Sequence, residues 1–456
     1  METMKRSFSP SKITHYANHR LADGFLASPE NLDQLREYVI YASKNGLRLS
    51  ALGTQNSFSD IFLNDGQLHL SILKINRIIL FDPAKKLIVV EPGVQVWQIL
   101  QLVMPQGFYL TGLSGSYTDT LSGMISSNSF GKDSWRNGNC GENVLSIKLM
   151  VASGEIIEVN QENPLFDAVI GGLGTLGIIT EIWLELKPLP SFNLEIKNNS
   201  ILIKHICDFP KIAPLQYVWL DMSGQKNPRF VHKTATFCEP SIINDNDIPP
   251  PNLSILGLSP KIFWKTIRIG WRPSTYKVAN TILYLGQIAN IRSMYYSNWI
   301  SYYYPFAKFP MNCHIFKDSR FYEWQVLFDL DKFETVFNEI NSLMRKFKIY
   351  PIAPSIRWHK PSKGHLTFAG LGISLLVSFE AYIIESDIGQ KFKSSFFELV
   401  FMHGGKTYLS KYPYFSNREV ILQYPKINSL VQEKKHTDPN NLFLTQRTAA
   451  LLNIDI

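Results

Sequence analysis

The sequence has few cysteines and no long apolar run, and both absences narrow the classes of protein that fit it. The four cysteines lie far apart with no CxxC pair, so neither a zinc site nor a disulfide framework is indicated. The longest apolar run, residues 371–384, is too short to cross a bilayer and contains Glu380. Residues 1–20 lack the apolar core of a secretion signal. We therefore expect a cytoplasmic protein, with peripheral contact to a membrane left open.

Several common catalytic motifs are also missing. The chain has no GxxxxGK[ST], no HExxH, no GxSxG and no carboxylate-rich metal loop, so no metal ligands are expected. A GxGxxG pattern does occur, at Gly172, Gly174 and Gly177. A Rossmann dinucleotide site needs a strand before these glycines and a helix after them, whereas here a short helix precedes them and a β-rich run follows. The pattern therefore indicates a tight turn instead.

What is present is the composition of an ordinary folded protein. The chain has 456 residues, of which 45% are hydrophobic and 18% charged. This length has room for two or three domains around a large core. The net charge of +8 is spread along the chain, so it marks no nucleic-acid surface and we expect no nucleic-acid partner.

The first 190 residues alternate short helical and strand patterns. The predicted elements are helices over 31–46 and 94–107, hairpins over 77–93 and 144–160, a short helix over 163–172 and a long strand over 177–190. Because hairpins mix with helices and no βαβ unit repeats, the predicted fold class is α+β. Prolines near 188–191 indicate a domain boundary.

From residue 320 the order of strands and helices predicts a sheet with helices on one face, a frequent arrangement in substrate-binding caps. The predicted strands are 321–330, 354–359, 372–380 and 406–411, and the predicted helices are 332–348 and 388–405. Before this region, residues 238–254 are polar and rich in proline, which predicts a long loop.

Three stretches of small residues follow one another in the first domain. They are ALGTQNSFSD (51–60), GSYTDTLSGMISSNSFGK (115–132) and GGLGTLG (171–177). Turns of this kind present backbone N–H groups with no side chains in the way, and they bind anions such as a diphosphate. Each stretch alone is more often structural, but the three together indicate a diphosphate site.

With VVEPGVQVWQIL (89–100), GNCGENVLSIKLMVASGEI (138–156) and HGGKTYLSKYPYF (403–415), these stretches resemble the vanillyl-alcohol-oxidase superfamily and its PCMH-type FAD-binding domain. Within it, the sequence is similar to decaprenylphosphoryl-ribose oxidases and also to aldonolactone and alditol oxidases. The resemblance is strong over 45–190 and 400–454 and weak over 320–380. It implies an FAD-binding domain over 1–190, a substrate-binding cap domain over 191–404, and a segment over 405–456 that returns to the FAD-binding domain.

The resemblance implies FAD as the cofactor. The positions that match the family's cofactor contacts are Gly53, Thr54, Gln55, Asn56, Ser57, Gly115, Ser116, Thr120, Gly123, Ser127, Gly174, Ile179 and Tyr408. In aldonolactone oxidases, a histidine in the first turn holds the flavin covalently. Asn56 stands at that position here and cannot form the bond, so we expect FAD to be bound non-covalently.

The resemblance also implies catalytic residues. Lys411 matches a lysine beside flavin and substrate, where a cation would lower the cost of forming an alkoxide and a neutral amine could take the hydroxyl proton. Gln325 and Arg357 match substrate-pocket positions, and the arginine could hold a phosphate through two hydrogen bonds. Lys132 matches a loop lysine near flavin or substrate. The alternative for each cation is a solvated surface position.

The chain departs from the family pattern at two aromatic positions. Phe130 replaces the histidine of an HGK loop, and Phe58 replaces a tyrosine-like residue of the first turn. Neither phenylalanine side chain can donate a hydrogen bond. We therefore do not expect the substrate and the electron acceptor to be necessarily those of the family. We interpret His359, His365 and His403 as loop or surface residues and not as replacements. The aromatic stretch 293–310 is interpreted as a packed strand or cap face, with a groove for a prenyl chain or sugar rings as the alternative.

The resulting hypothesis is an FAD-dependent oxidoreductase that oxidises a secondary hydroxyl of a phosphorylated or polyprenyl-phosphate sugar to the ketone. A separate NAD(P)H-dependent reductase would then complete an epimerisation. Two alternatives stay open: an aldonolactone or alditol oxidase with a soluble substrate, and a flavin-binding protein without catalysis.

Overall fold

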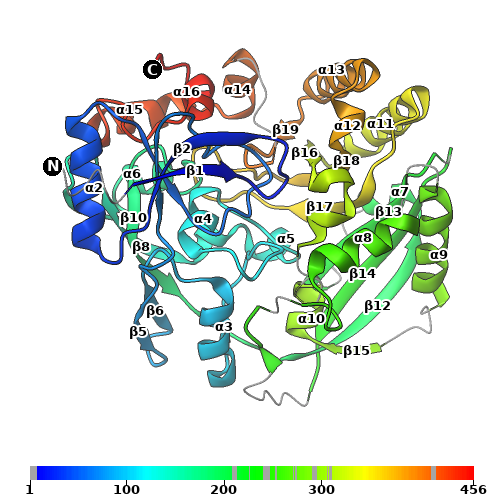
Figure 1. Cartoon of the computed structure of the whole chain (residues 1–456). Helices are drawn as coiled ribbons and strands as arrows, with labels where there is room; N and C mark the ends of the chain where they lie inside the picture. The colour runs from blue at the N-terminus through cyan, green and yellow to red at the C-terminus, as the bar shows by residue number, and fades with distance from the viewer. Residues whose placement is uncertain are drawn as a thin grey trace.

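The protein consists of two halves, each built on β-sheets, that lie side by side (Figure 1). The computed structural model describes residues 8–207, 213–224, 226–239, 247–251, 254–270, 272, 275–289, 295–305, 307, 311–411 and 417–456. Helices and strands alternate without a regular repeat, so the predicted α+β class is confirmed. Among the described residues, no helix is long and apolar enough to cross a bilayer.

The first half begins with a four-stranded sheet in the order β1-β2-β4-β3, in which only β1 and β2 are antiparallel. Its strands are β1 (Ser9–Thr14), β2 (Leu21–Ala27), β3 (Leu49–Leu52) and β4 (Leu68–Ser71). The helix α2 (Leu32–Lys44) joins β2 to β3, and the side chain of Asn31 caps its amino end by accepting from the backbone N–H of Gln34. The predicted helix over 31–46 is thereby confirmed.

A five-stranded antiparallel sheet completes this half, in the order β5-β6-β10-β8-β9. Its strands are β5 (Ile78–Asp82), β6 (Leu87–Val90), β8 (Val144–Met150), β9 (Ile156–Asn160) and β10 (Ile178–Glu185), and a small ribbon pairs β7 (Phe108–Tyr109) with β11 (Lys187–Pro188). Both predicted hairpins are present. The helical segments between the strands are α3 (Val96–Val103), η1 (Met104–Gln106), α4 (Leu121–Ser126), α5 (Ser134–Asn137), η2 (Cys140–Asn143) and α6 (Leu165–Val169).

The glycines of GGLGTLG lie in a turn between a helix and a strand. The short helix α6 precedes them and β10 follows, which is the reverse of a Rossmann site. Gly174 has a φ of 74°, in the left-handed region that glycine adopts without strain. The interpretation as a tight turn is confirmed.

The second half is built on an eight-stranded antiparallel sheet in the order β15-β12-β14-β13-β17-β18-β16-β19. Its strands are β12 (Asn193–Ile201), β13 (Leu215–Asp221), β14 (Arg229–Phe237), β15 (Tyr295–Asn298), β16 (Phe321–Asp329), β17 (Ile352–His359), β18 (Gly372–Glu380) and β19 (Lys406–Thr407). The helical segments of this half are α7 (Ile203–Cys207), α8 (Pro260–Gly270), α9 (Tyr276–Ala289), α10 (Trp299–Tyr303), η4 (Asn312–Ile315), η5 (Lys317–Ser319), α11 (Phe333–Phe347), α12 (Ala381–Ile384) and α13 (Asp387–Met402).

Successive side chains of this sheet point to opposite faces, and the two faces have different partners. On β16, Trp324, Val326 and Phe328 belong to an apolar core that includes residues of α11 and α13. Their neighbours Glu323 and Gln325 are also buried, on the face away from these helices. The predicted sheet with helices on one face is therefore confirmed, and on β16 the other face carries buried polar residues.

The carboxyl-terminal segment packs against the first half. Its helices are α14 (Asn417–Gln423), α15 (Ile427–Thr437) and α16 (Gln446–Leu452), and several of their apolar side chains share a core with the five-stranded sheet (Figure 1). The buried carboxylate of Asp60 joins the two parts, because it accepts from Arg447 at 2.8 Å and from Arg20 at 2.7 Å.

Two predicted segments differ from the structure in extent. The strand predicted over 406–411 covers only β19, because the backbone turns back at Lys411, whose N–H donates to the carbonyl of Tyr408 at 2.9 Å. In the aromatic stretch, Trp299 and Tyr303 are buried and their rings stack 4.4 Å apart, so the packed interpretation holds for residues 299–304, whereas Tyr295 and Tyr296 are exposed. Residues 293, 294, 306 and 308–310 of that stretch lie outside the described residues, as do 240–246 and 252–253 of the predicted loop over 238–254.

Candidate active site

The three turns of small residues meet at one place in the first half. The first turn follows β3, and a β-carbon added at Gly53 would lie only 2.3 Å from Thr120 Oγ1 in the second turn. Asn56 Nδ2 donates to Asp119 Oδ1 at 2.7 Å, again between the first and second turns. The third turn reaches the end of α4, where the N–H of Leu173 donates to the carbonyl of Ser126 at 2.8 Å. Turns that are well separated in sequence, at 51–60, 115–132 and 171–177, thus form one continuous surface.

Asp119 is the acidic group of this surface. Its carboxylate accepts from Asn56 and from Ser114 Oγ, the latter at 2.6 Å. Burial nevertheless raises the pKa of Asp119, and the hydrogen bonds from Ser114 and Asn56 oppose this rise. The amide of Asn56 is therefore engaged in orienting the second turn, as a hydrogen-bond donor and not as a nucleophile.

The surface has room for a ligand close to the backbone. A β-carbon added at Gly115 or at Gly174 would meet no described atom within 4 Å. Gly115 and its neighbour Ser116 are also accessible from outside. Small residues with free space above them are what a diphosphate needs in order to approach backbone N–H groups. The residues present therefore fit the diphosphate of FAD.

Other predicted cofactor positions are closely packed. Thr120 is buried beside Gly53, and Ser127 donates from Oγ to the carbonyl of Gly123 at 2.8 Å. Tyr408 donates from its hydroxyl to the carbonyl of Ser127 at 3.2 Å. Ile179 is buried in the core of the five-stranded sheet. The remaining predicted positions, Thr54, Gln55 and Ser57, lie in the first turn.

The polar face of the eight-stranded sheet covers the end of the second turn. Phe130 is buried there, and its ring lies 4.7 Å from His359 of β17, 5.2 Å from Tyr408 and 5.4 Å from Phe368. The amino-terminal half thus supplies an apolar ring, and the strands supply polar groups around it. The two halves meet at this contact.

Lys411 reaches the same region from the turn after β19. Its ammonium forms an ion pair with Glu323 of β16 and lies 4.9 Å from the centre of the Phe58 ring. Burial lowers the pKa of Lys411, whereas Glu323 opposes that effect and Arg357 adds to it. A buried lysine held in this way can carry or release a proton more readily than a surface lysine.

Lys132 is enclosed by aromatic rings. Its Nζ donates to the carbonyl of Tyr303 at 2.5 Å and lies between 5.2 and 5.5 Å from the ring centres of Tyr217, Tyr302 and Tyr303. Burial places the pKa of Lys132 well below its usual value, and the nearby charges of Arg357 and Lys233 lower it further. The solvated alternative for Lys132 is therefore wrong, and its place near flavin or substrate stays a prediction.

Arg357, Gln325 and His359 each carry a buried polar atom with no hydrogen-bond partner among the described residues. These atoms are Arg357 Nε, Gln325 Oε1 and His359 Nδ1. Gln325 donates from Nε2 to Ser374 Oγ at 3.0 Å, and His359 Nε2 lies 2.8 Å from the same hydroxyl. A buried polar atom without a partner is costly, so these three mark where a polar ligand would complete the site. The surface alternative for Arg357 is wrong.

The interpretation of His359 as a loop or surface residue is also wrong. His359 is fully buried, and burial lowers its pKa to about 3, so the imidazole is neutral. The signal in the sequence was the spacing of two residues between Arg357 and His359 on β17, because residues two apart on a strand share a face. His403 ends α13 and pairs with Glu339 at 2.9 Å, and His365 lies in a loop, so neither joins the site.

Comparisons with known proteins agree with this geometry. Residues 24–160 match the family described as FAD binding domain. The chain therefore contains a PCMH-type FAD-binding domain, as the resemblance implied. The turns 51–60 and 115–132 lie within the matched residues, and the turn 171–177 follows them in sequence and contacts the second turn. Such a domain binds FAD.

The relatives include sugar and lactone oxidases. Over 150 residues the chain is 31% identical to decaprenylphosphoryl-beta-D-ribose oxidase of Mycolicibacterium smegmatis, covering 32% of this chain and 33% of that protein. It is 29% identical over 168 residues to a putative D-arabinono-1,4-lactone oxidase of Neurospora crassa, covering 36% and 30%. It is 25% identical over 221 residues to L-gulonolactone oxidase of Bos taurus, covering 47% and 49%. The matches thus span about a third to a half of the length of these relatives.

The free space beside the α-carbon of Gly115 leads to a prediction about FAD binding. Gly115→Val should weaken FAD binding by about tenfold or more, because the added side chain would occupy the space that a diphosphate needs. Titration of the apoprotein with FAD, followed by flavin fluorescence, measures this. Gly286→Val on α9 is the matched control, since a β-carbon there also meets no described atom within 4 Å. Equal affinities of the two variants for FAD would contradict the assignment.

Proposed function

We propose that the protein is an FAD-dependent oxidoreductase that oxidises a secondary hydroxyl of a phosphorylated, polyprenyl-linked sugar to the ketone. The observation that carries this proposal is a set of buried cationic side chains around Arg357, whose charge adds to burial in lowering the pKa of both Lys132 and Lys411. Lys132, Arg357 and Lys411 are all withdrawn from water, and burial lowers the pKa of each. Glu323 pairs with Lys411, which leaves Lys132 and Arg357 without an ion pair to a carboxylate among the described residues.

An anionic ligand would offset the cost of burying these charges. A phosphate group is the natural partner of Arg357, because the planar guanidinium can donate two parallel hydrogen bonds to it. The similarity to the decaprenylphosphoryl-beta-D-ribose oxidase of Mycolicibacterium smegmatis supports a phosphorylated ribose as the substrate class. The gulonolactone and arabinonolactone oxidases support the alternative of a soluble lactone or alditol.

The chain's own residues can perform the proton chemistry of this reaction. Bound FAD would supply the acceptor for the hydride that leaves the carbinol carbon. Lys411, in its neutral form, takes the hydroxyl proton as the C=O bond forms, and Glu323 then holds the resulting ammonium. Gln325 orients the sugar through its free Oε1, and the neutral His359 holds Gln325 in place through Ser374.

We further propose that FAD is bound non-covalently. Asn56 occupies the position of a linking histidine, and its amide is committed to Asp119. Acid precipitation of the purified protein should therefore leave the yellow colour in the supernatant. A pellet that keeps its flavin absorbance would contradict this proposal.

The reaction can be tested by anaerobic bleaching of the flavin. A polyprenylphosphoryl-ribose should bleach it, whereas lactones and alditols should not. Lys411→Met should slow the bleaching by about 10²–10⁴-fold, because the proton acceptor is lost, while Lys435→Met on α15 should leave it unchanged. Bleaching by lactones alone would favour the alternative, and a colourless protein that cannot be reconstituted with FAD would exclude both.

The ion pair of Lys411 leads to a prediction about pH. Because the neutral amine is the active form, the bleaching rate should rise with pH and level off above a midpoint below 10.5, the ordinary pKa of lysine. Glu323 favours the ammonium, so Glu323→Gln should lower the pKa of Lys411 and move this midpoint to lower pH.

The pH dependence of the bleaching rate, measured by stopped-flow absorbance, provides the test. Glu385→Gln is the control, because Glu385 forms an ion pair with Arg320 that is partly exposed. A midpoint that stays in place or rises in Glu323→Gln would show that Lys411 is not the base.

A further inference from the structure

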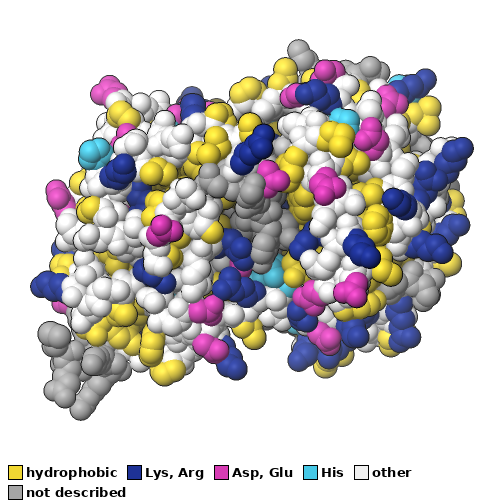
Figure 2. Space-filling model, turned by 90° about the horizontal axis from the view of Figure 1, so that it is seen from above, with side chains coloured by type: hydrophobic (Ala, Val, Ile, Leu, Met, Phe, Trp, Pro, Cys, Tyr) yellow, Lys and Arg dark blue, Asp and Glu magenta, His cyan; other side chains and the backbone are white. Residues whose placement is uncertain are grey.

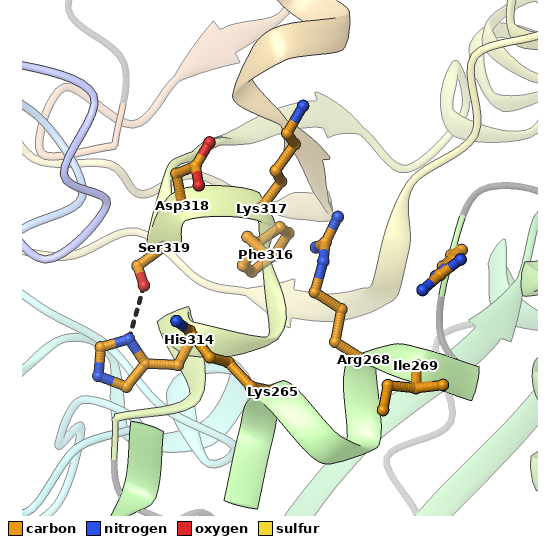
Figure 3. Close-up of a pocket in the computed structure, with 9 residues that line it drawn as sticks. Lys265, Arg268, Ile269, His314, Phe316, Lys317, Asp318 and Ser319 are labelled. Carbon is orange, nitrogen blue, oxygen red and sulfur yellow. Dashed lines mark hydrogen bonds between the residues drawn. The ribbon is translucent and has the colours of Figure 1, made fainter. Parts of the chain in front are cut away.

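A second cationic site lies outside the active site, between α8 and the short 3-10 helices η4 and η5. It is a pocket of about 280 Å³ whose lining includes four cationic side chains and a single acidic one (Figure 3). The cations are Lys265, Arg268, Arg272 and Lys317, and the acid is Asp318. In Figure 3, Lys265, Arg268 and Ile269 come from α8, and His314 to Ser319 face them from the two turns.

Two of these cations have no acidic partner in the described part of the chain. Arg268 is engaged, because its Nη1 donates to Glu380 at 2.7 Å and to the carbonyl of Ile315 at 2.8 Å. Lys317 lies 4.9 Å from the centre of the Tyr382 ring. Lys265 and Arg272 are exposed and form no ion pair with any described residue. The pocket therefore has an excess of positive charge that a phosphate-type anion would balance.

Exposed apolar side chains lie on α8, beside the pocket, and on α9. On α8, Ile262 and Ile269 are seven residues apart, and so lie on the same side of the helix. On α9, Val278, Ile282 and Leu285 follow the spacing i, i+4, i+7, and Leu256 in the turn before α8 is 89% exposed. All five helix residues are more than half exposed. Amphipathic helices of a globular protein ordinarily bury such a stripe against the core, so these two present it to an external partner.

Ile269 joins the two features, since it is 66% exposed and also lines the cationic pocket. An apolar stripe bordered by lysine and arginine is the pattern of helices that lie in the interface of an anionic membrane. There the apolar side chains enter the acyl region and the cations meet the phosphates. Seen from above, the half built on the eight-stranded sheet carries many Lys and Arg side chains, with apolar and acidic ones among them (Figure 2).

We propose that α8, with the pocket formed by Lys265, Arg268, Arg272 and Lys317, docks on an anionic lipid bilayer. A lipid phosphate occupies the pocket, and Ile262 and Ile269 insert beside it.

The docking surface lies close to the active site. Phe316 lines the pocket and stacks on Phe321 at 4.2 Å. Phe321 contacts Phe58 at 5.7 Å, and the ammonium of Lys411 lies over the Phe58 ring. A membrane-anchored substrate would therefore be presented a few aromatic rings from Lys411. The docking itself rests on the surface alone and does not depend on the proposed reaction.

Vesicle flotation tests the proposal without any turnover. The full-length protein should bind vesicles of phosphatidylcholine with phosphatidylglycerol at least about tenfold more tightly than vesicles of phosphatidylcholine alone, and added salt should weaken the binding. Lys265→Ser with Arg272→Ser, and separately Ile262→Asn with Ile269→Asn, should each weaken it about tenfold or more. All four side chains are exposed, so folding should be unaffected, which the thermal melting curve checks.

The matched control is Ile388→Asn with Lys391→Ser on α13, which changes one exposed isoleucine and one exposed lysine elsewhere. This control should bind the anionic vesicles like the unchanged protein. The proposal is overturned if binding does not depend on phosphatidylglycerol, or if the control is weakened as much as the other variants. It is also overturned if the apolar pair abolishes self-association in sedimentation velocity with no effect on vesicles, or if the cationic pair loses only inorganic phosphate binding.

Discussion

The withdrawal of positive charge from water, at the contact between the two halves, is the constraint on which the candidate active site depends. Lys132, Arg357 and Lys411 are buried where the eight-stranded sheet meets the first half, and of the three only Lys411 forms an ion pair within the described residues, with Glu323. Such a cluster is tolerated only when hydrogen bonds, aromatic rings or a bound anion replace the lost hydration. The rings of Tyr217, Tyr302 and Tyr303 around Lys132 supply part of this replacement.

The architecture of the second half brings this cluster about. Helices α11 and α13 cover one face of the sheet and take up its large apolar side chains. Because neighbouring side chains of a strand alternate between faces, Glu323, Gln325, Arg357 and His359 point to the opposite face, where His359 contacts Phe130 of the first half. The short β19 has a related effect: it pairs with β16 over Lys406–Thr407, and the chain then turns so that Lys411 comes back to Glu323.

The contact between Phe130 and His359 marks where this protein departs from the family it resembles. The resemblance implies a histidine at this loop position, where the chain has the apolar ring of Phe130, and an imidazole enters the same contact from β17. Burial and the charge of Arg357 keep that imidazole neutral. The site therefore retains an imidazole, but on a strand of the second half and linked through Ser374 to Gln325.

The sequence by itself determined the local elements and the presence of an FAD-binding domain. Hairpins, helix ends and the turn at Gly174 depend on side-chain periodicity and on residues that are close in the chain, so the pattern of residues predicts them. It did not determine the burial of His359 and Arg357, which a strand pattern leaves equally consistent with an exposed face. Only the tertiary structure decided that, because the partner that covers the face, the loop around Phe130, lies more than two hundred residues away in the chain. The exposed stripes of α8 and α9 were decided in the same way: their spacing suits a buried face, and only the packing of the whole chain left them uncovered.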